Sequence, residues 1–353
     1  MKKLVLLALL LALVLGACAD PGAPKASSDT TPTQRDETAV SSGLIYLFAE
    51  GTATERFHEK ELEFWDEFYA GGMRDLFLET SYCKAAYLNE WMQADSDDVL
   101  LRLFDDGIEA EETGSLLAFY RAIKEQYPET VFHGTDVGHE FSSLGERYLS
   151  ELREAGLENS ESYALAKENN EQGVAFYDIL NYDVLIGLAY QENVMAQNFI
   201  REFEHSGSNG VMGIYSLLHA DSESLCLSGN APSMAQQIAS QYGGAVHSLR
   251  LTDELTVKGK PYAASYCGEY SASHLNLGFD TMEIWQSDAA YADLCDCPRT
   301  EVVFPSSGFR LPPKEKTVLI VDFTSAEGTR RWYFLSDGIA ENGQAVMVQI
   351  LSD

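Results

Sequence analysis

The sequence predicts an α/β protein with a mainly parallel sheet flanked by helices, followed by a β-rich C-terminal extension. Up to about residue 250, short apolar runs typical of strands buried on both faces alternate with amphipathic segments of helical length. Such alternation implies helical crossovers between parallel strands. From residue 253 onward, strand-like segments follow one another with turns between them. We therefore predict an α/β domain over residues 43–252 and an extension packed on it over residues 253–353.

The first 42 residues lie outside the predicted fold. Lys2 and Lys3 precede an apolar run over residues 4–15, as in a signal peptide. The run ends in Leu15-Gly16-Ala17-Cys18, which resembles a bacterial lipobox. The resemblance implies that residues 1–18 direct export and that Cys18 is lipidated. An ordinary signal peptide with an incidental cysteine is the alternative.

Residues 19–42 are rich in Ala, Pro, Ser, Thr and Asp and are predicted to form a disordered tether. No later run is long and apolar enough for a transmembrane helix, so lipid on Cys18 is the predicted attachment to the outer face of the bacterial cell membrane.

The formal net charge is −31, from 55 acidic and 24 basic residues. Such a surface repels phosphate backbones, so we expect no nucleic-acid partner. The charge indicates no particular substrate, and the ligand that we expect on other grounds is a small molecule or a peptide. Five cysteines remain after Cys18, and an odd number cannot pair completely within one chain.

The elements of the α/β domain follow from apolar periodicity. In the helix over residues 55–70, His58, Leu62, Trp65 and Tyr69 recur at spacings of four, three and four. His58 is accordingly predicted to be a packed residue and not a ligand. Strands are predicted at 44–48, 75–78, within 130–139, 211–218 and 245–251. Further helices are predicted at 83–92, 97–104, 116–127, 142–156, 160–204 and 232–242. In the extension, strands are predicted at 256–266, 316–323, 330–334 and 344–351, with an irregular stretch near 268–300.

Acidic or imidazole residues stand at the ends of four predicted strands: Glu50, Glu79, His133 with Asp136, and His219. Ligands of open parallel sheets bind at the carboxyl ends of the strands, so we expect these side chains to converge on one rim. They form a predicted acid/base site, or a divalent metal site whose candidate ligands are Glu79, Asp136, His139 and His219. Taken singly, each residue also has a structural explanation, such as a helix cap for Glu79 or an Asx-turn for Asp136.

Familiar catalytic motifs are missing from the sequence. It contains no G-x-S-x-G elbow, no P-loop, no G-x-G-x-x-G after a strand and no H-E-x-x-H. Their absence weighs against a serine hydrolase and against a nucleotide-dependent enzyme.

Five short motifs occur in a recognisable order: Ala49-Glu50, Glu63-Phe64, Leu76-Phe77-Leu78-Glu79, residues 192–198 and residues 213–219. In this order they resemble the superfamily that groups erythromycin-esterase-like proteins with the Tiki, TraB and ChaN (haem-uptake) families. The resemblance implies a hydrolase of ester or peptide bonds. In it, Glu50 and Glu79 would orient or deprotonate water and His219 would act as base or acid, with His133 and Asp136 assisting.

One position departs from this pattern. The histidine expected two or three residues after the first glutamate is replaced, because Thr52 and Ala53 stand there. In the family that histidine takes part in metal binding or water activation. Asp136 and His139 are candidates to compensate for it. The alternatives are a lipoprotein that binds a ligand or haem without turnover, and an adhesin or structural surface protein.

Overall fold

The computed structural model describes residues 44–52, 55–104, 110–207, 210–222, 231–304, 315–339 and 345–351. The predicted signal peptide, the tether and Cys18 lie outside these ranges. All the described residues belong to the unit Ala39–Asp353. Within them, no helix combines the length and the apolar character needed to cross a membrane.

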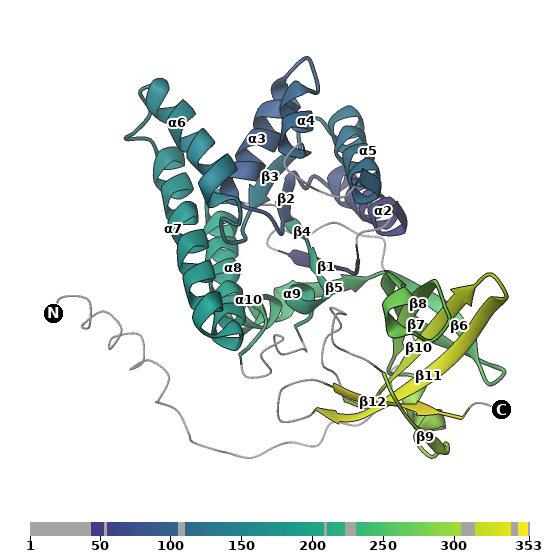
Figure 1. Cartoon of the computed structure of the whole chain (residues 1–353). Helices are drawn as coiled ribbons and strands as arrows, with labels where there is room; N and C mark the ends of the chain where they lie inside the picture. Colours follow the sequence, from purple (N-terminus) through teal and green to yellow (C-terminus); the bar gives the residue numbers. More distant parts are fainter. Residues whose placement is uncertain are drawn as a thin grey trace. The chain divides into compact units, whose positions relative to one another are not determined.

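A five-stranded parallel sheet forms the centre of the α/β part (Figure 1). Its strand order is β3-β2-β4-β1-β5, so β4 lies between β2 and β1. The strands are β1 (Ile45–Glu50), β2 (Asp75–Leu78), β3 (Val131–Gly134), β4 (Val211–Ser216) and β5 (Val246–Arg250). The predicted alternation of buried strands and helices is therefore confirmed.

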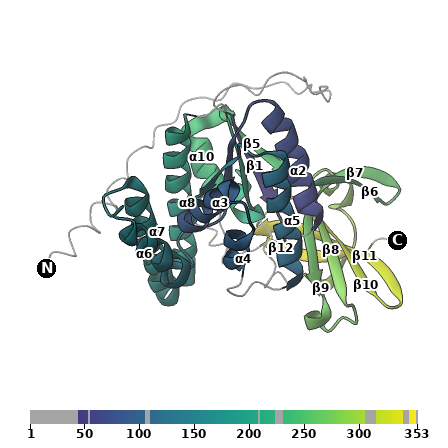
Figure 2. The ribbon, with the colours of Figure 1, turned by 90° about the horizontal axis from the view of Figure 1, so that it is seen from above.

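Helices cover both faces of this sheet (Figure 2). One apolar cluster joins Phe48, Leu78 and Ile214 to helices α2 and α5, and another joins Leu47 and Tyr215 to helices α8 and α10. Burial of each large side chain contributes roughly 1.5–3 kcal/mol. The helices are α2 (Glu55–Ala70), α3 (Tyr82–Gln93), α4 (Asp98–Phe104), α5 (Ala110–Gln126), α6 (Glu146–Glu154), α7 (Glu161–Tyr182), α8 (Val184–Ser206) and α10 (Met234–Tyr242).

Two predicted helical regions differ from the structure in detail. The helix predicted at 142–156 begins as a π-helical turn, Phe141–Gly145, before α6. The long region at 160–204 is two helices that meet at Asp183. The Asp183 carboxylate accepts the backbone N–H groups of Leu185 and Ile186. An N-cap of this kind satisfies donors that the new helix leaves unpaired, which favours a break at this residue.

The predicted strand at 211–218 is shorter than expected. β4 ends at Ser216, and Leu217–Ala220 form the short helix α9, which contains His219. The Ser216 N–H donates to the Glu79 side chain (2.6 Å). A carboxylate thus accepts the N–H at the end of the strand, and the chain turns into α9 at this point.

The C-terminal part is a seven-stranded antiparallel sheet with the order β6-β7-β8-β10-β11-β12-β9. The predicted strand at 256–266 is instead a hairpin, because Lys258 and Gly259 adopt positive φ angles of 49° and 77° and form its turn. The stretch near 268–300, predicted to be irregular, includes β8. The strands are β6 (Thr252–Val257), β7 (Lys260–Ser271), β8 (Thr281–Ser287), β9 (Arg299–Val303), β10 (Thr317–Ser325), β11 (Gly328–Ile339) and β12 (Ala345–Ile350).

Helix α2 packs against this second sheet. Arg56 donates to both carboxylate oxygens of Asp253 at 2.6 Å. The rings of Phe57 and Tyr266 are 5.4 Å apart, and the guanidinium of Arg56 lies over Tyr266. The same helix therefore contacts the parallel sheet and the antiparallel extension.

Candidate functional site

Glu79 and His219, both predicted site residues, lie next to each other. Glu79 follows β2, and His219 lies on α9 immediately after β4. Because β2 and β4 are parallel neighbours, their carboxyl ends meet at one edge of the sheet. His219 Nε2 is 3.6 Å from Glu79 Oε1, while Glu79 Oε2 accepts the Ser216 N–H. The backbone thereby directs the second oxygen of Glu79 toward the imidazole.

Glu192 on α8 completes what we call the His219 cluster, formed by Glu79, His219 and Glu192. Glu192 is 2% exposed, and its Oε1 lies 2.9 Å from His219 Nδ1. Its Oε2 accepts the N–H of Met234, the first residue of α10 (2.6 Å). A helix N-terminus stabilises a carboxylate, and the Glu192 carboxylate orients the imidazole through Nδ1.

The charges around His219 determine its protonation. Burial disfavours the imidazolium, but Glu79 and Glu192 outweigh burial and raise the pKa of His219 to about 10. At neutral pH, His219 is therefore a cation whose Nε2–H faces Glu79. In this protonation state His219 can donate a proton from Nε2.

A cavity of about 250 Å³ opens against the His219 cluster. Its polar wall includes all three members of the cluster together with His139 and Gln191. The rest of the wall is apolar and consists of Phe176, Leu180, Leu188 and Leu218. A small apolar cavity with a few convergent polar groups is the usual form of a ligand site.

Asp136 and His139 form a second pair beside the cavity. Asp136 Oδ2 lies 3.0 Å from His139 Nε2, and Gln191 Nε2 donates to Asp136 Oδ1 at 3.0 Å. Burial opposes ionisation of Asp136, but the hydrogen bonds from His139 and Gln191 lower its pKa overall. His139 Nδ1 is 3.1 Å from the Tyr177 hydroxyl. Of this pair, only the His139 ring reaches the cavity wall.

His133 does not join this group. Its Nε2 lies 2.9 Å from Asp75 and its Nδ1 lies 3.3 Å from Glu202. The ring stacks on Phe77 and lines a different cavity of about 650 Å³. The expectation that all strand-end residues converge is therefore wrong for His133. The strand alternation explains this, because His133 lies within β3 and not beyond its end.

Glu50 belongs to a separate group, which we call the His58 cluster: Glu50, His58 and Glu61. His58 Nε2 is 3.7 Å from Glu50 Oε1, and one ligand atom from each of the three residues lies within 4.8 Å of the others. His58 is 5% exposed and Glu61 1%. The prediction that His58 is only a packed helix residue is incomplete, because its ring also faces two carboxyl groups.

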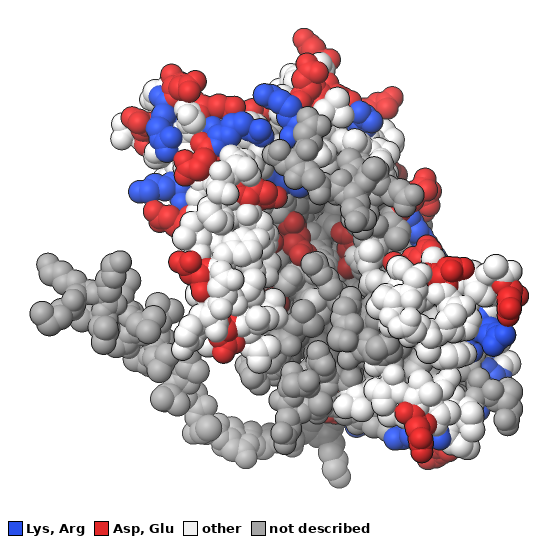
Figure 3. Space-filling view, in the orientation of Figure 1, with Lys and Arg blue, Asp and Glu red and all other residues white. Residues whose placement is uncertain are grey.

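The two clusters lie on either side of the end of β4. Glu50 pairs in register with Ser216, and Glu79 holds the Ser216 N–H. Glu50 is on the sheet face of Phe48, which packs on α2, whereas Glu192 reaches His219 from α8 on the other face. Figure 3 shows acidic side chains in the hollow at the centre of this face of the molecule.

The four predicted metal candidates do not form a metal-binding group. In the part of the chain that the structure describes, the only such set of three or more His, Cys, Asp or Glu side chains is the His58 cluster. Glu79 and His219 instead form an ion pair, and Asp136 and His139 form another.

Three site residues were missed by the sequence reasoning: Glu61, Gln191 and Glu192. Glu61 follows His58 by three residues and so shares its helix face, a signal that could have been used. Glu192 is the first residue of the motif over residues 192–198, but that motif predicted no role for it.

Comparisons with known proteins found solved structures that are similar to this chain. No protein-family model matches the sequence, and no curated protein matches it. Among solved structures, a Bacillus cereus protein matches with a TM-score of 0.41 and 14% identity over 59% of this chain and 65% of that one. The chain thus spans slightly less than two thirds of that protein.

Two further structures match over more of their length. An erythromycin esterase mutant in its open conformation has a TM-score of 0.43 and 12% identity, covering 69% of this chain and 82% of that one. A succinoglycan biosynthesis protein has a TM-score of 0.42 and 11% identity, covering 70% and 77%. The function of this chain is therefore inferred from its own residues.

Proposed function

We propose that this protein is a hydrolase that cleaves an ester bond in a small, uncharged or cationic molecule. The observation behind this proposal is the His219 cluster: a buried imidazolium, held between two anchored carboxylates, faces a small apolar cavity. A base and an acid are thereby placed side by side at the wall of this cavity.

Glu79 is the proposed base. Its Oε2 is fixed by the Ser216 N–H, so Oε1 is positioned to accept a proton from a water molecule in the cavity. The water oxygen attacks the ester carbonyl carbon, and Glu79 takes the proton. A carboxylate serves as the base because the neighbouring histidine is already protonated.

His219 is the proposed acid. Its Nε2–H stabilises the negative charge that develops on the substrate oxygen and then donates its proton to the departing alkoxide. The C–O bond breaks, and the products are a carboxylic acid and an alcohol. The proton held by Glu79 returns to His219, which restores the starting state. Glu192 acts as a positioning residue, because it fixes the ring through Nδ1.

The cavity limits the substrate. Its volume of about 250 Å³ is slightly below the roughly 300–1,000 Å³ of sites for drug-sized ligands, so a short acyl group fits best. Two carboxylates against one imidazolium disfavour an anionic substrate. Haem does not fit, because the cavity is small and both nitrogens of His219 face carboxylates. Small ligands could also bind here without turnover, and the assay below separates these two cases.

We also propose that the protein acts outside the cell, attached to the outer face of the bacterial membrane through lipid on Cys18. The apolar run after Lys2 and Lys3, the small residues before Cys18 and the tether support this proposal. Metabolic labelling with a fatty-acid analogue tests it, since label should enter the wild type and not Cys18→Ala.

The enzymatic proposal is tested with panels of short-chain esters and of peptides. The full chain should hydrolyse esters, and the double variant Glu79→Gln/His219→Ala should not. His205→Ala is the matched control, because His205 is an exposed residue near the end of the same helix as Glu192. Equal rates in the wild type and the double variant would contradict the proposal, and ligand binding without turnover would assign the site to a binding protein.

A further inference from the structure

Buried polar atoms in and beside the His58 cluster have no hydrogen-bond partner. In the described ranges, His58 Nδ1 and Glu61 Oε1 are buried without a hydrogen-bond partner. Ser216 Oγ, on the strand position paired with Glu50, is also buried and unpartnered. A buried polar atom without a partner costs about 1–3 kcal/mol. Several such atoms in one place indicate a missing ligand.

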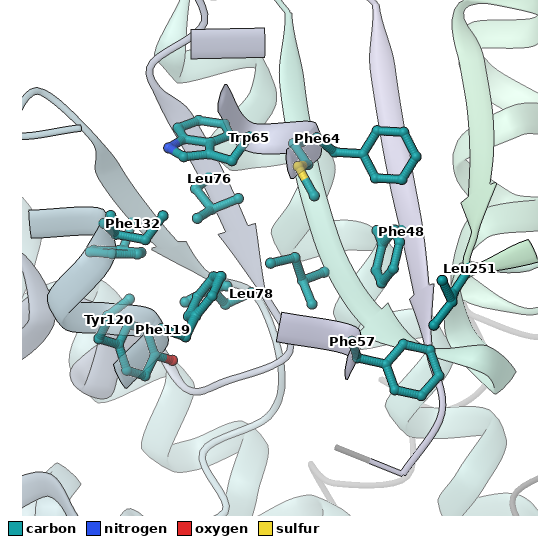
Figure 4. Packing of buried hydrophobic residues seen from close by; sticks show 14 of the residues in the cluster. Phe48, Phe57, Phe64, Trp65, Leu76, Leu78, Phe119, Tyr120, Phe132 and Leu251 are labelled. Carbon is teal, nitrogen blue, oxygen red and sulfur yellow. The ribbon is translucent and has the colours of Figure 1, made fainter. Parts of the chain in front are cut away.

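The surroundings explain why this arrangement is costly without a ligand. Phe119 lies beside His58, with ring centroids 5.5 Å apart, and Figure 4 shows Phe119 and Tyr120 of α5 packed near Leu78 of β2. Burial and the neighbouring Glu50 raise the pKa of Glu61 well above its usual range. In the described part of the chain, no Lys or Arg forms an ion pair with Glu61, although such pairs form elsewhere in the molecule.

We propose that Glu50, His58 and Glu61 bind a divalent transition-metal ion. The three residues converge from two elements: Glu50 ends β1, while His58 and Glu61 lie one turn apart on α2. Metal–ligand bonds of about 2.1 Å place neighbouring ligands ~3–4 Å apart, which fits ligand atoms within 4.8 Å of one another.

The ligand types indicate which ions suit the site. Two carboxylates neutralise the charge of a divalent ion, and a neutral imidazole adds a nitrogen ligand. Mg²⁺ and Ca²⁺ prefer all-oxygen sites, whereas imidazole suits first-row transition metals. Three protein ligands leave at least one coordination position for water or for the substrate. The ion would thereby hold the start of α2 against the end of β1.

This proposal is independent of the hydrolytic role of the His219 cluster.

The test is equilibrium dialysis of the full chain against MnCl₂, with excess Mg²⁺ to suppress weak binding to surface acids. Mn²⁺ is the probe because it binds thiolates poorly, so Cys295 and Cys297 do not compete. The wild type should retain one equivalent. Glu61→Gln and His58→Gln should each bind at least tenfold more weakly, and Glu59→Gln, an exposed change on the same helix, should bind like the wild type.

Two results would overturn the proposal. If the wild type retains no Mn²⁺, the His58 cluster is not a metal site. If Glu61→Gln and His58→Gln both retain the full equivalent, the ion binds elsewhere. Circular dichroism of each variant shows whether it is folded. Should one of the two variants fail to fold, the other and the wild type still decide the matter.

Discussion

The two clusters at the end of β4 contain the same residue types and have opposite electrostatics. In the His219 cluster each carboxylate accepts a backbone N–H, and the imidazole lies between the two. In the His58 cluster, buried atoms of His58 and Glu61 have no partner. The pKa of His219 is raised to about 10 by Glu79 and Glu192, whereas burial lowers the pKa of His58 to about 4. Hydrogen-bond geometry, more than composition, determines what a buried Glu–His group can do.

The largest effect on stability is expected when His219 is removed. His219→Ala should leave the buried Glu192 without its cation, and breaking a buried ion pair typically costs about 3–5 kcal/mol. Denaturant unfolding at pH 7 measures this change, with the exposed His205→Ala as control. A loss below about 1 kcal/mol would mean that the ion pair contributes little to the fold.

Because of the same ion pairs, the free energy of unfolding should decrease as the pH rises into the alkaline range. The folded pKa of His219, about 10, lies above the usual 6.5, so its contribution to stability is complete below pH 6.5. The contribution is lost as the pH rises through about 10, and it amounts to a few kcal/mol because each pH unit corresponds to about 1.4 kcal/mol. Urea unfolding from pH 6 to 10.5 should show this slope in the wild type and a smaller one in His219→Gln. Parallel slopes would contradict the assignment.

Glu61→Gln should have the opposite effect on stability when no metal is present. The change removes an ionisable group that is 1% exposed and keeps its shape, so the metal-free protein should gain on the order of 1 kcal/mol. Thermal unfolding in the presence of a chelator measures the gain. Glu59→Gln should stay within about 0.5 kcal/mol of the wild type. Destabilisation by Glu61→Gln would show that its carboxyl group is already well paired.

The smallest effect is expected at His139. Its side chain is 33% exposed and reaches the cavity wall from outside the His219 cluster. His139→Gln should alter KM for an ester more than kcat, with changes of less than about tenfold, because the residue shapes the cavity without giving or taking the proton. A kcat loss as large as that of Glu79→Gln would place His139 in the proton-transfer step.

The parallel sheet could be predicted because apolar periodicity is local. Leu76, Phe77 and Leu78 indicate a buried strand wherever they lie in the chain. Glu79 and His219 could be placed together because parallel neighbouring strands end at the same edge. Pairing order was not available from the sequence, and it is the insertion of β4 between β1 and β2 that separates Glu50 from Glu79.

The direction in which a side chain points was the second feature that the sequence could not predict. His133 follows an apolar run in the sequence as Glu79 does, but it turns toward Asp75 and Glu202. His58 occupies an apolar helix position, and only the docking of α2 on β1 shows that it faces Glu50. The turn at Lys258 and Gly259 was not predicted, because residues 256–266 were predicted to form one strand.

The central claim is that Glu79 and His219 act together as base and acid. The most direct measurement is kcat/KM of the full chain for a short, uncharged ester, compared between the wild type, Glu79→Gln and the exposed control Glu204→Gln. We expect Glu79→Gln to lower kcat/KM at least about 100-fold, the usual contribution of a positioned base. Equal kcat/KM values in Glu79→Gln and the wild type would contradict the claim.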